Sequence, residues 1–515
     1  MDKKQNQTIK DFCKEDYILM YLTCTLGILI TTIGTLCATY NIPQWFVNSK
    51  FESSLKIATD SPIYAAWIDP PVPIYMKFYV FDVLNGDKIV KGEKPHLREK
   101  GPYVYRMQVP KFNVSFHSNG SVSFFNNHTL YFERRMSSGS ENDVVNTLNV
   151  PLASMGSMVT DLPPFVSYFG MMQRMVTMAG GSKLFSPRTI KEIIWGYQDP
   201  IFTMLNNLQL FTGEKVEPIF GFFHKFNNSD DGSYLVHTGV KNYKQVHQII
   251  KWKGEKYLKF WSTKYANMIN GTDGSFLGPD ITTKDTPYMY FPQMCRSMKL
   301  EYEQESEIKG IKTMQFHLSD DFLANSTINP NNADFCVPPG NCYDSGVLNV
   351  QSSMGGAPGF VSLPHFYNAA EKYQKAFDGL NPQKDEHDSI FHVEPKSGAV
   401  LKGDRKLQIN ILLKSSQYFE QLKRVRELIF PVVWLGGAAE VDDATASELR
   451  SVMSIVKFMG VVSYLIIASG ISILLGFFLC LASMWHRGKL TCLKSFKKGK
   501  IKQNNVEINR DEITL

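Results

Sequence analysis

Two long apolar stretches lie near the two ends of the chain, and a long segment of mixed character separates them. Residues 17–40 and 458–484 contain no charged side chain. Each stretch exceeds the ~20 apolar residues that cross the ~30 Å hydrocarbon core of a bilayer. Residues 41–457 contain no comparable apolar run. The pattern therefore predicts a two-span membrane hairpin that carries one large domain on a single side of the membrane.

The pattern inside the large domain is mainly that of strands. Apolar and polar residues alternate over 72–83 and 103–109, and Asn85-Gly86 and Gly101-Pro102 supply turn residues next to these runs. Strand-like runs return after Gly221 and continue to about residue 430. The large domain is therefore predicted to be of mixed α+β class, with mostly antiparallel strands.

A segment rich in methionine and helix formers interrupts the strand pattern over residues 142–204. Breaks at Pro163-Pro164, Gly180-Gly181 and Pro187 divide it, which predicts a bundle of short helices. Methionine is flexible and suits surfaces that accommodate varied apolar ligands, although ordinary core packing is the better explanation of any single one. The methionines of this segment include Met155, Met158, Met171, Met172, Met175 and Met178.

Charge decides which side of the membrane each part occupies. From residue 486 onward the tail has eight Lys and Arg against three acids, whereas residues 1–16 have four Lys and four acids. Basic residues next to a span stay in the cytoplasm. The tails 1–16 and 485–515 are therefore predicted to be cytoplasmic, and 41–457 extracellular or lumenal. A cleaved signal peptide is the alternative for the first span, but its apolar stretch is longer than a ~7–15 residue signal core.

The net charge of +6 does not indicate nucleic-acid binding, because the C-terminal tail alone supplies +5 of it. A basic segment just inside a membrane is explained by topology and by attraction to anionic lipids. Binding to a polyanion would need a basic face on the large domain, and the sequence shows none there.

Cysteines and sequons support an ectodomain in the secretory pathway. Cys336 and Cys342 lie in the loop CVPPGNC, where a local disulfide closes easily, and Cys295 is left as a free or alternatively paired thiol. Few cysteines mean that the domain depends on a core instead of a disulfide lattice. Glycosylation is predicted at six Asn-X-Ser/Thr sites between the spans. These are Asn113, Asn119, Asn127, Asn227, Asn270 and Asn325.

Motifs for catalysis, cofactors and metals are missing from the sequence. It contains no G-x-S-x-G, H-E-x-x-H, P-loop or dinucleotide motif. His387 and His392 flank Asp388, but without a partner at metal-ligand spacing they are predicted to be surface histidines. Asn227 begins a run like a calcium loop, but Thr238 stands where the twelfth-position Glu belongs. No catalytic residue, cofactor or metal is therefore predicted.

Nearly the whole chain resembles the class B scavenger receptor family, which includes lipid scavenger receptors, the lysosomal integral membrane protein, and insect croquemort and sensory neuron membrane proteins. The order and spacing of the motifs carry the resemblance, besides the two terminal spans. The motifs are PVPIYMKFYVFDV (71–83), GPYVYR (101–106), WGYQDP (195–200), MCRS (294–297), FCVPPGNCYDSGVLNV (335–350), LPHF (363–366), HVEPKSGAVLKGDRKLQIN (392–410) and FPVVWL (430–435).

The resemblance implies an irregular antiparallel β-barrel with an apical helical bundle and an apolar tunnel that leads toward the bilayer. The segment 142–204 falls where the bundle is expected. Ligands of the family approach at this apex, which makes Met171, Met175, Arg174, Lys183 and Arg188 the candidate entrance residues, although solvation of the three cations is an equally good explanation of each.

The chain departs from the family pattern in ways that bear on its thiols and its location. A second disulfide usually joins the position of Cys295 to that of Ser353, so this bridge is lost here. The tail ends in DEITL and has no acidic dileucine signal, which favours the plasma membrane over the lysosome or endosome.

The predicted function is a scavenger-type receptor that binds lipids or lipid-bearing particles and passes lipid through the tunnel to the membrane or into endocytosis. Expected partners are fatty acids, sterols or carotenoids, lipoprotein-like or anionic particles, membrane lipids and other copies of the chain. One alternative is a docking receptor for a lumenal protein cargo. Another is a two-span ligand-gated channel subunit, although such ectodomains are usually far richer in cysteine.

Overall fold

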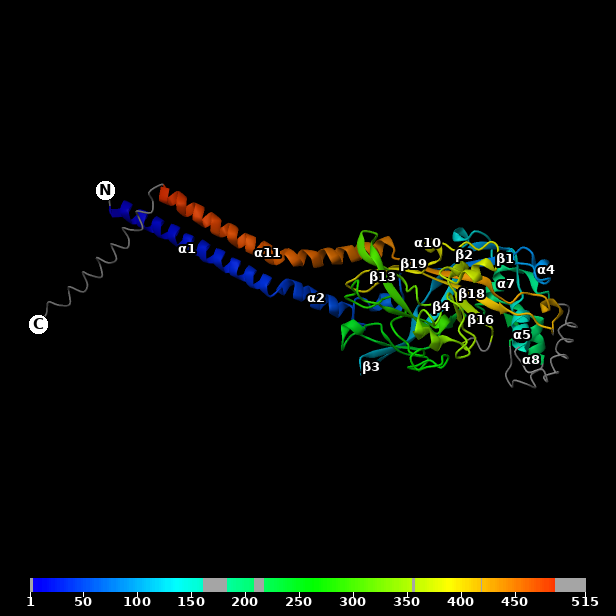
Figure 1. Cartoon of the computed structure of the whole chain (residues 1–515). Coiled ribbons are helices and arrows are strands. Elements are labelled where there is room, and N and C mark those ends of the chain that lie inside the picture. Colours follow the sequence, from blue (N-terminus) through cyan, green and yellow to red (C-terminus); the bar gives the residue numbers. More distant parts are fainter. Residues whose placement is uncertain (1–2, 161–182, 208–216, 354–356, 418, 487–515) are drawn as a thin grey trace. The chain divides into compact units, whose positions relative to one another are not determined.

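The computed structural model of the chain (Figure 1) describes residues 3–160, 183–207, 217–353, 357–417 and 419–486. Side chains are described for residues 18–157, 183–203, 217–353, 357–417 and 419–486. The chain forms two compact units. One contains residues 1–52 and 448–515, and the other contains residues 53–447. Each unit is described by itself.

The first unit is built on two long helices that run alongside each other, α1 (Lys3–Thr39) and α11 (Asp443–His486) (Figure 1). Both are long and apolar enough to cross a membrane, as the sequence predicts. The 44 residues of α11 span about 66 Å, which is about twice the hydrocarbon thickness. Its first turns contain Asp443, Glu448 and Arg450, so only its later part is suited to lipid.

Small residues allow the two helices to approach closely. A Cβ at Gly470 would lie 2.6 Å from the backbone nitrogen of Thr31, and a Cβ at Gly34 would lie 2.8 Å from that of Ile467. Close backbone approach at small residues is a common basis of helix association in membranes. The other faces of these helices expose apolar side chains such as Leu22 and Phe478, which suits contact with acyl chains.

A 15-stranded antiparallel sheet forms the frame of the second unit. Its main path runs in the order β11-β10-β4-β2-β1-β19-β18-β17-β14-β13-β12. The strands are β1 (Ile74–Val83), β2 (Leu97–Gln108), β3 (Lys111–His117), β4 (Ser121–Phe132), β9 (Ser229–Asp230), β10 (Tyr234–His237), β11 (Ile249–Trp252), β12 (Tyr288–Phe291), β13 (Arg296–Ile308), β14 (Ile311–Leu318), β15 (Val347–Asn349), β16 (Gly359–Ser362), β17 (Ile390–Val393), β18 (Val400–Leu413) and β19 (Leu428–Glu440).

The sheet is irregular because its end strands, β11 and β12, are not paired with each other in the described residues. A loop connects them instead. The amide of Ile249 in β11 donates to the carbonyl of Gly271, and the amide of Tyr290 in β12 donates to that of Thr272. The predicted mixed α+β class and irregular β core are confirmed, and the closure is by a loop and not by a strand pair.

The segment 142–204 combines helices with a strand pair that the sequence did not predict. Strand β5 (Val144–Leu148) pairs with β6 (Phe185–Thr189), and helix α5 (Val150–Thr160) contacts α8 (Pro200–Asn207) and β18. These helices lie together at one end of the sheet (Figure 1). The strand pair holds together parts of the chain that are 37 to 45 residues apart.

The remaining helices are short. They are α2 (Ile42–Ser54), α3 (Tyr64–Ile68), α4 (Gly86–Ile89), α7 (Ile190–Trp195), α9 (Glu371–Lys375) and α10 (Lys384–His387). Helix α7 begins with a capping box, in which Thr189 and Glu192 satisfy each other's backbone amides. The main core cluster lies on the sheet's inner face, with residues such as Phe78, Leu407 and Leu435 from adjacent strands.

Candidate functional site

The predicted entrance residues lie only partly within the described structure. Met171, Arg174 and Met175 are outside the described residues, and Lys183 is exposed just before β6. The Arg188 guanidinium packs 3.9 Å from the centre of the Tyr197 ring, and Arg188 also lies within electrostatic range of Asp199. This packing fits a structural role for Arg188. The entrance itself remains a prediction.

The large domain contains an aromatic cavity of about 580 Å³, and the residues that line it follow the segment 142–204 in the sequence. Its walls come from the run Ile219–Phe226, from Trp252 on β11, and from the turn that precedes β13. Cavities of 300–1,000 Å³ with mainly apolar walls are the usual ligand sites of proteins. Its aromatic lining residues are Phe220, Phe222, Phe223, Phe226, Trp252 and Phe260.

Helix α7 and one glycine position the aromatic wall. The amides of Phe222 and Phe223 donate to the carbonyls of Ile193 and Ile194 at the end of α7. A Cβ at Gly221 would lie 2.5 Å from the backbone nitrogen of Gly196, so only glycine fits there. Helix α7 therefore positions the consecutive residues Phe222 and Phe223, which lie in a loop and not in a strand.

Charged groups surround the cavity mouth. Lys225 and Lys253 are exposed, as is Asp230, and all three line the cavity. Lys225 and His224 both contact Glu217, and their hydrogen bonds lower the pKa of that carboxyl. The cavity thus combines apolar walls with a polar mouth, which suits an amphipathic ligand.

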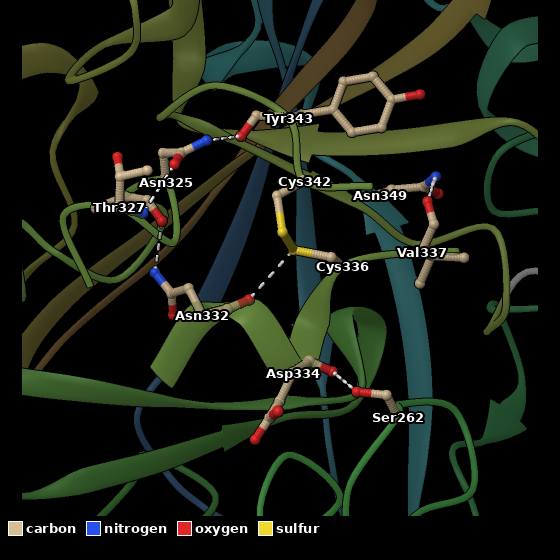
Figure 2. Close-up of a disulfide and its surroundings, with 11 residues drawn as sticks. Ser262, Asn325, Thr327, Asn332, Asp334, Cys336, Val337, Cys342, Tyr343 and Asn349 are labelled. Carbon is tan, nitrogen blue, oxygen red and sulfur yellow. Dashed lines mark hydrogen bonds between the residues drawn. A yellow bond between two sulfur atoms is a disulfide. The ribbon is translucent and has the colours of Figure 1, made fainter. Parts of the chain in front are cut away.

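Several polar groups surround the disulfide, and Figure 2 shows hydrogen bonds among them. The predicted bond between Cys336 and Cys342 is present. The Asn325 amide donates to the carbonyl of Tyr343 over 2.7 Å, and the Asn349 amide donates to that of Val337 over 3.1 Å. Buried amides that are satisfied in this way stabilise a fold and leave little for a ligand.

A third polar group joins Glu99, His365 and His387, whose candidate ligand atoms lie within 4.8 Å of one another. His387 is 3% exposed, so the prediction of a surface histidine is wrong. The reason is that His387, the last residue of α10, packs against the rings of His365 and Trp434. Burial is the main cause that lowers the pKa of His387 to about 4, followed by the nearby His365.

The hydrogen bonds of this group do not suit a metal. The backbone amide of Asn381 donates to Nδ1 of His365 over 3.0 Å, and that of Gln383 donates to Nδ1 of His387 over 2.8 Å. Each neutral imidazole therefore carries its proton on Nε2, and His365 donates this proton to Glu99 over 2.6 Å. Histidines that bind a metal usually donate from the other ring nitrogen, whereas both of these accept.

Comparison with known proteins identifies the family. The sequence model of the CD36 family matches residues 25–481. Lysosome membrane protein 2 of Mus musculus is 35% identical over 451 residues, which cover 87% of this chain and 91% of that protein. Scavenger receptor class B member 1 of Mus musculus is 35% identical over 409 residues, which cover 79% of this chain and 78% of that protein.

The chain belongs to the CD36 family. Human lysosome membrane protein 2 is 33% identical over 453 residues, and these cover 87% of this chain and 91% of that protein. The predicted class B scavenger receptor resemblance is therefore confirmed.

One departure from the CD36 family pattern lies in the cavity wall. Cys295 is a buried free cysteine whose thiol donates to the carbonyl of Pro292, and its side chain also contacts that of Ser353. Burial raises the pKa of the Cys295 thiol to about 11. Ser353 thus lies beside the Cys295 thiol, at the position where the family resemblance places a cysteine partner. The Cys295 thiol stays protonated at neutral pH.

The six predicted glycosylation sites differ in their surroundings. Asn113 and Asn119 are exposed on and next to β3, whereas the other four are half-buried. The Asn227 side-chain oxygen accepts from the amide of Leu130, and Asn325 is bonded at both ends of its amide. Glycosylation at each site remains a prediction.

Sequence reasoning missed the aromatic cavity in this CD36-family member. The signal is the run IFGFFHKF at 219–226, with four phenylalanines in eight residues next to a glycine. The run follows neither a helical nor a strand period, so it has no obvious face to bury. An aromatic-rich loop without a period is a usable signal for a cavity wall.

Proposed function

We propose that this protein is a membrane receptor that binds lipids in the aromatic cavity of its large domain and delivers them to the membrane or to endocytosis. The observation that carries the proposal is the cavity itself, whose walls are phenylalanine and tryptophan and whose mouth is charged. Family membership supports a receptor role. No covalent step is required.

Partition of an acyl chain into the cavity supplies the driving force. Each buried methylene contributes ~0.8 kcal/mol, so ten of them contribute about 8 kcal/mol. This gain offsets the cost of association, and the charged mouth keeps the polar end of the lipid in contact with polar groups.

The test is to purify the full chain from its native cells and to identify co-purifying lipids by mass spectrometry. Phe260→Asp places a carboxylate in the cavity wall and should remove most of the bound lipid, because burying a charge in an apolar site is costly. Phe116→Asp is the matched control, since Phe116 is 41% exposed and lies outside the cavity lining. Absence of lipid from the wild type would contradict the proposal and favour docking of a protein cargo.

Both chain ends are proposed to lie in the cytoplasm, at the plasma membrane. The basic tail after residue 486 and the six sequons between the spans support this orientation. Tags at both ends should be accessible to antibodies only after permeabilisation, and a C-terminal tag that is accessible on intact cells would refute it.

The entrance is proposed to lie in residues 142–204. Neutralising Arg174 and Lys183 together should slow the capture of anionic particles at low salt, and high salt should mask the effect because exposed charges are screened within ~10 Å at 0.1 M. Replacing Met171 and Met175 with Asp should impair the uptake of neutral lipid at any salt concentration. Equal salt sensitivity of both variants would place the entrance elsewhere.

A further inference from the structure

Arg405 is a cation on the inner face of β18. Side chains two residues apart on a strand share a face, and Leu407 and Ile409, which follow Arg405 at this spacing, belong to the main core cluster. The Arg405 guanidinium lies 4.0 Å from the centre of the Phe291 ring, and Phe291 is only 2% exposed. Arg405 is half-buried, and its side chain lies on the core-facing side of β18.

The Arg405 side chain makes no hydrogen bond or ion pair with any residue that the structure describes. Burial lowers its pKa, and Tyr234, Asp273 and Asp231 act in the opposite direction from a distance. A half-buried charge without a bonded partner is partly desolvated, which costs free energy. Arg405 thus keeps its donors available at a cost in stability.

Other polar atoms without partners lie in the same neighbourhood. Asp231 accepts from the Tyr234 hydroxyl with one carboxylate oxygen, and its other oxygen, Oδ1, is buried without a hydrogen bond. The indole nitrogen of Trp252 and the hydroxyl of Tyr290 are likewise buried without one, and their rings contact each other at 5.5 Å. Each such group costs roughly 1–3 kcal/mol until something bonds to it.

Two of these groups are next to the aromatic cavity, and Arg405 lies within electrostatic range of one of them, Asp231. Asp231 and Trp252 are themselves part of the cavity lining. Tyr234 pairs with Trp252 in the register of β10 and β11, so the polar neighbourhood and the aromatic wall share a strand pair. An amphipathic molecule can therefore occupy the cavity with its apolar part and reach these groups with its polar end.

We propose that Arg405 binds the anionic headgroup, carboxylate or phosphate, of a lipid whose apolar chain occupies the aromatic cavity, and that the unpartnered atoms around Asp231 hydrogen-bond to the same headgroup. This inference rests on the proposed function, since it assumes that the cavity holds lipid. It adds a residue that selects among lipids by their headgroup.

The balance of donors and charge favours an anion. Arg405 offers five N–H donors in a planar fork that matches a carboxylate or phosphate, and Trp252 adds one more. Burial is the main influence on the carboxyl of Asp231, and it raises the pKa of that group toward the neutral form. Burial also acts to raise the pKa of Asp273, but Lys111 and Ser275 outweigh it, so this carboxylate already has a cationic neighbour. Arg405 is then an inward-facing cation that has no bonded carboxylate among the described residues, whereas Lys225 and Lys253 lie at the exposed mouth.

The test compares two probes with the same chain and different headgroups. Radiolabelled oleic acid and oleyl alcohol are titrated against the full chain in lipid nanodiscs, with empty nanodiscs as background. Arg405→Met should weaken oleate binding roughly 10- to 100-fold, the loss of a charge-assisted bond, and leave oleyl alcohol unchanged. Removing a half-buried unpaired charge should not unfold the domain, so the variant remains measurable.

Each remaining outcome has a separate meaning. Equal oleate affinity of Arg405→Met and wild type, with Phe260→Asp still abolishing both probes, would overturn the headgroup site and leave the lipid cavity standing. Failure of the wild type to bind either probe would overturn both proposals.

Competition with small anions distinguishes a lipid headgroup from a free anion. Acetate or inorganic phosphate at millimolar concentration should not displace oleate, because neither has a chain for the cavity. Displacement by either anion would show a site for a free anion and overturn the lipid headgroup assignment.

Discussion

Two arginines in the large domain, the buried Arg296 and the half-buried Arg405, have similar aromatic surroundings and different partners. Arg296 lies over the rings of Phe322 and Phe335, and Arg405 lies over that of Phe291. Arg296 donates to the side-chain oxygen of Asn332 over 2.6 Å, whereas Arg405 bonds to no described residue. Packing alone therefore does not tell a structural cation from one that is available to a ligand.

The region around Arg296 shows what a completed network looks like. Asn332 accepts from Arg296 and donates to the carbonyls of Asp321, Phe322 and Ala324, next to the disulfide that Figure 2 shows. Buried polar groups that are all satisfied stiffen a core, and partly satisfied ones are costly. The unpaired polar groups around Arg405 keep this free-energy cost, which is typical of sites that bind a ligand.

The largest expected difference is in stability. Arg296→Met should lower the free energy of unfolding by about 2–4 kcal/mol, because it leaves a buried acceptor on Asn332 unsatisfied and removes two ring contacts. Arg405→Met should leave the free energy of unfolding unchanged or raise it. Chemical unfolding of the full chain in detergent measures both. A loss at Arg405 as large as that at Arg296 would indicate that Arg405 is structural.

The pH dependence tests the other satisfied network, around His387. The unfolded chain binds a proton at His387 near pH 6.5, but the folded domain binds it only near pH 4 because of burial. Stability from this residue is therefore complete above pH 6.5 and is lost as the pH falls toward 4. The loss between pH 7 and pH 5 is about 2 kcal/mol.

His387→Gln should flatten the pH profile by this amount. Unfolding midpoints measured from pH 7 to pH 5 give the comparison. An unchanged slope in His387→Gln would mean that folding does not shift the pKa of this histidine.

Two tyrosine hydroxyls repeat the comparison at the level of single hydrogen bonds. The Tyr105 hydroxyl donates to Glu141 over 2.6 Å and accepts from Trp195, so Tyr105→Phe should cost about 1.5–3 kcal/mol. The Tyr290 hydroxyl has no hydrogen-bond partner among the described residues, so Tyr290→Phe should raise the free energy of unfolding, by up to about 1–3 kcal/mol, and should weaken oleate binding. Thermal unfolding and oleate titration of the same samples would separate the two roles. A stability loss of more than 1 kcal/mol in Tyr290→Phe would count against its place in the site.

Local features of the sequence were predictable. The two spans follow from continuous apolar runs, the Cys336–Cys342 bond follows from a short loop, and β1 follows from its turn signals and apolar run. In each case the information lies within about 25 neighbouring residues. The same is true of the capped start of α7, which has the local Thr-x-x-Glu signature.

Features that depend on long-range pairing were not predictable. Arg405 stands in the run GDRK, which reads as a surface segment, and only the pairing of β18 with β19 and β17 turns it inward. His387 stands in the polar run KDEHD and is buried because α10 packs against Trp434. Such residues have polar neighbours in sequence and apolar neighbours in space, so composition misleads.

The most direct test of the account is photo-crosslinking with a fatty acid that carries a diazirine at the end of its chain and an alkyne tag. Peptide mapping of the full chain in nanodiscs should place the label on the aromatic run 219–226 or on Phe260, and excess oleic acid should compete it away. In Arg405→Met, labelling at low probe concentration should fall. Labelling confined to the helices α1 and α11, with none on the cavity wall, would contradict the claim that the cavity holds lipid.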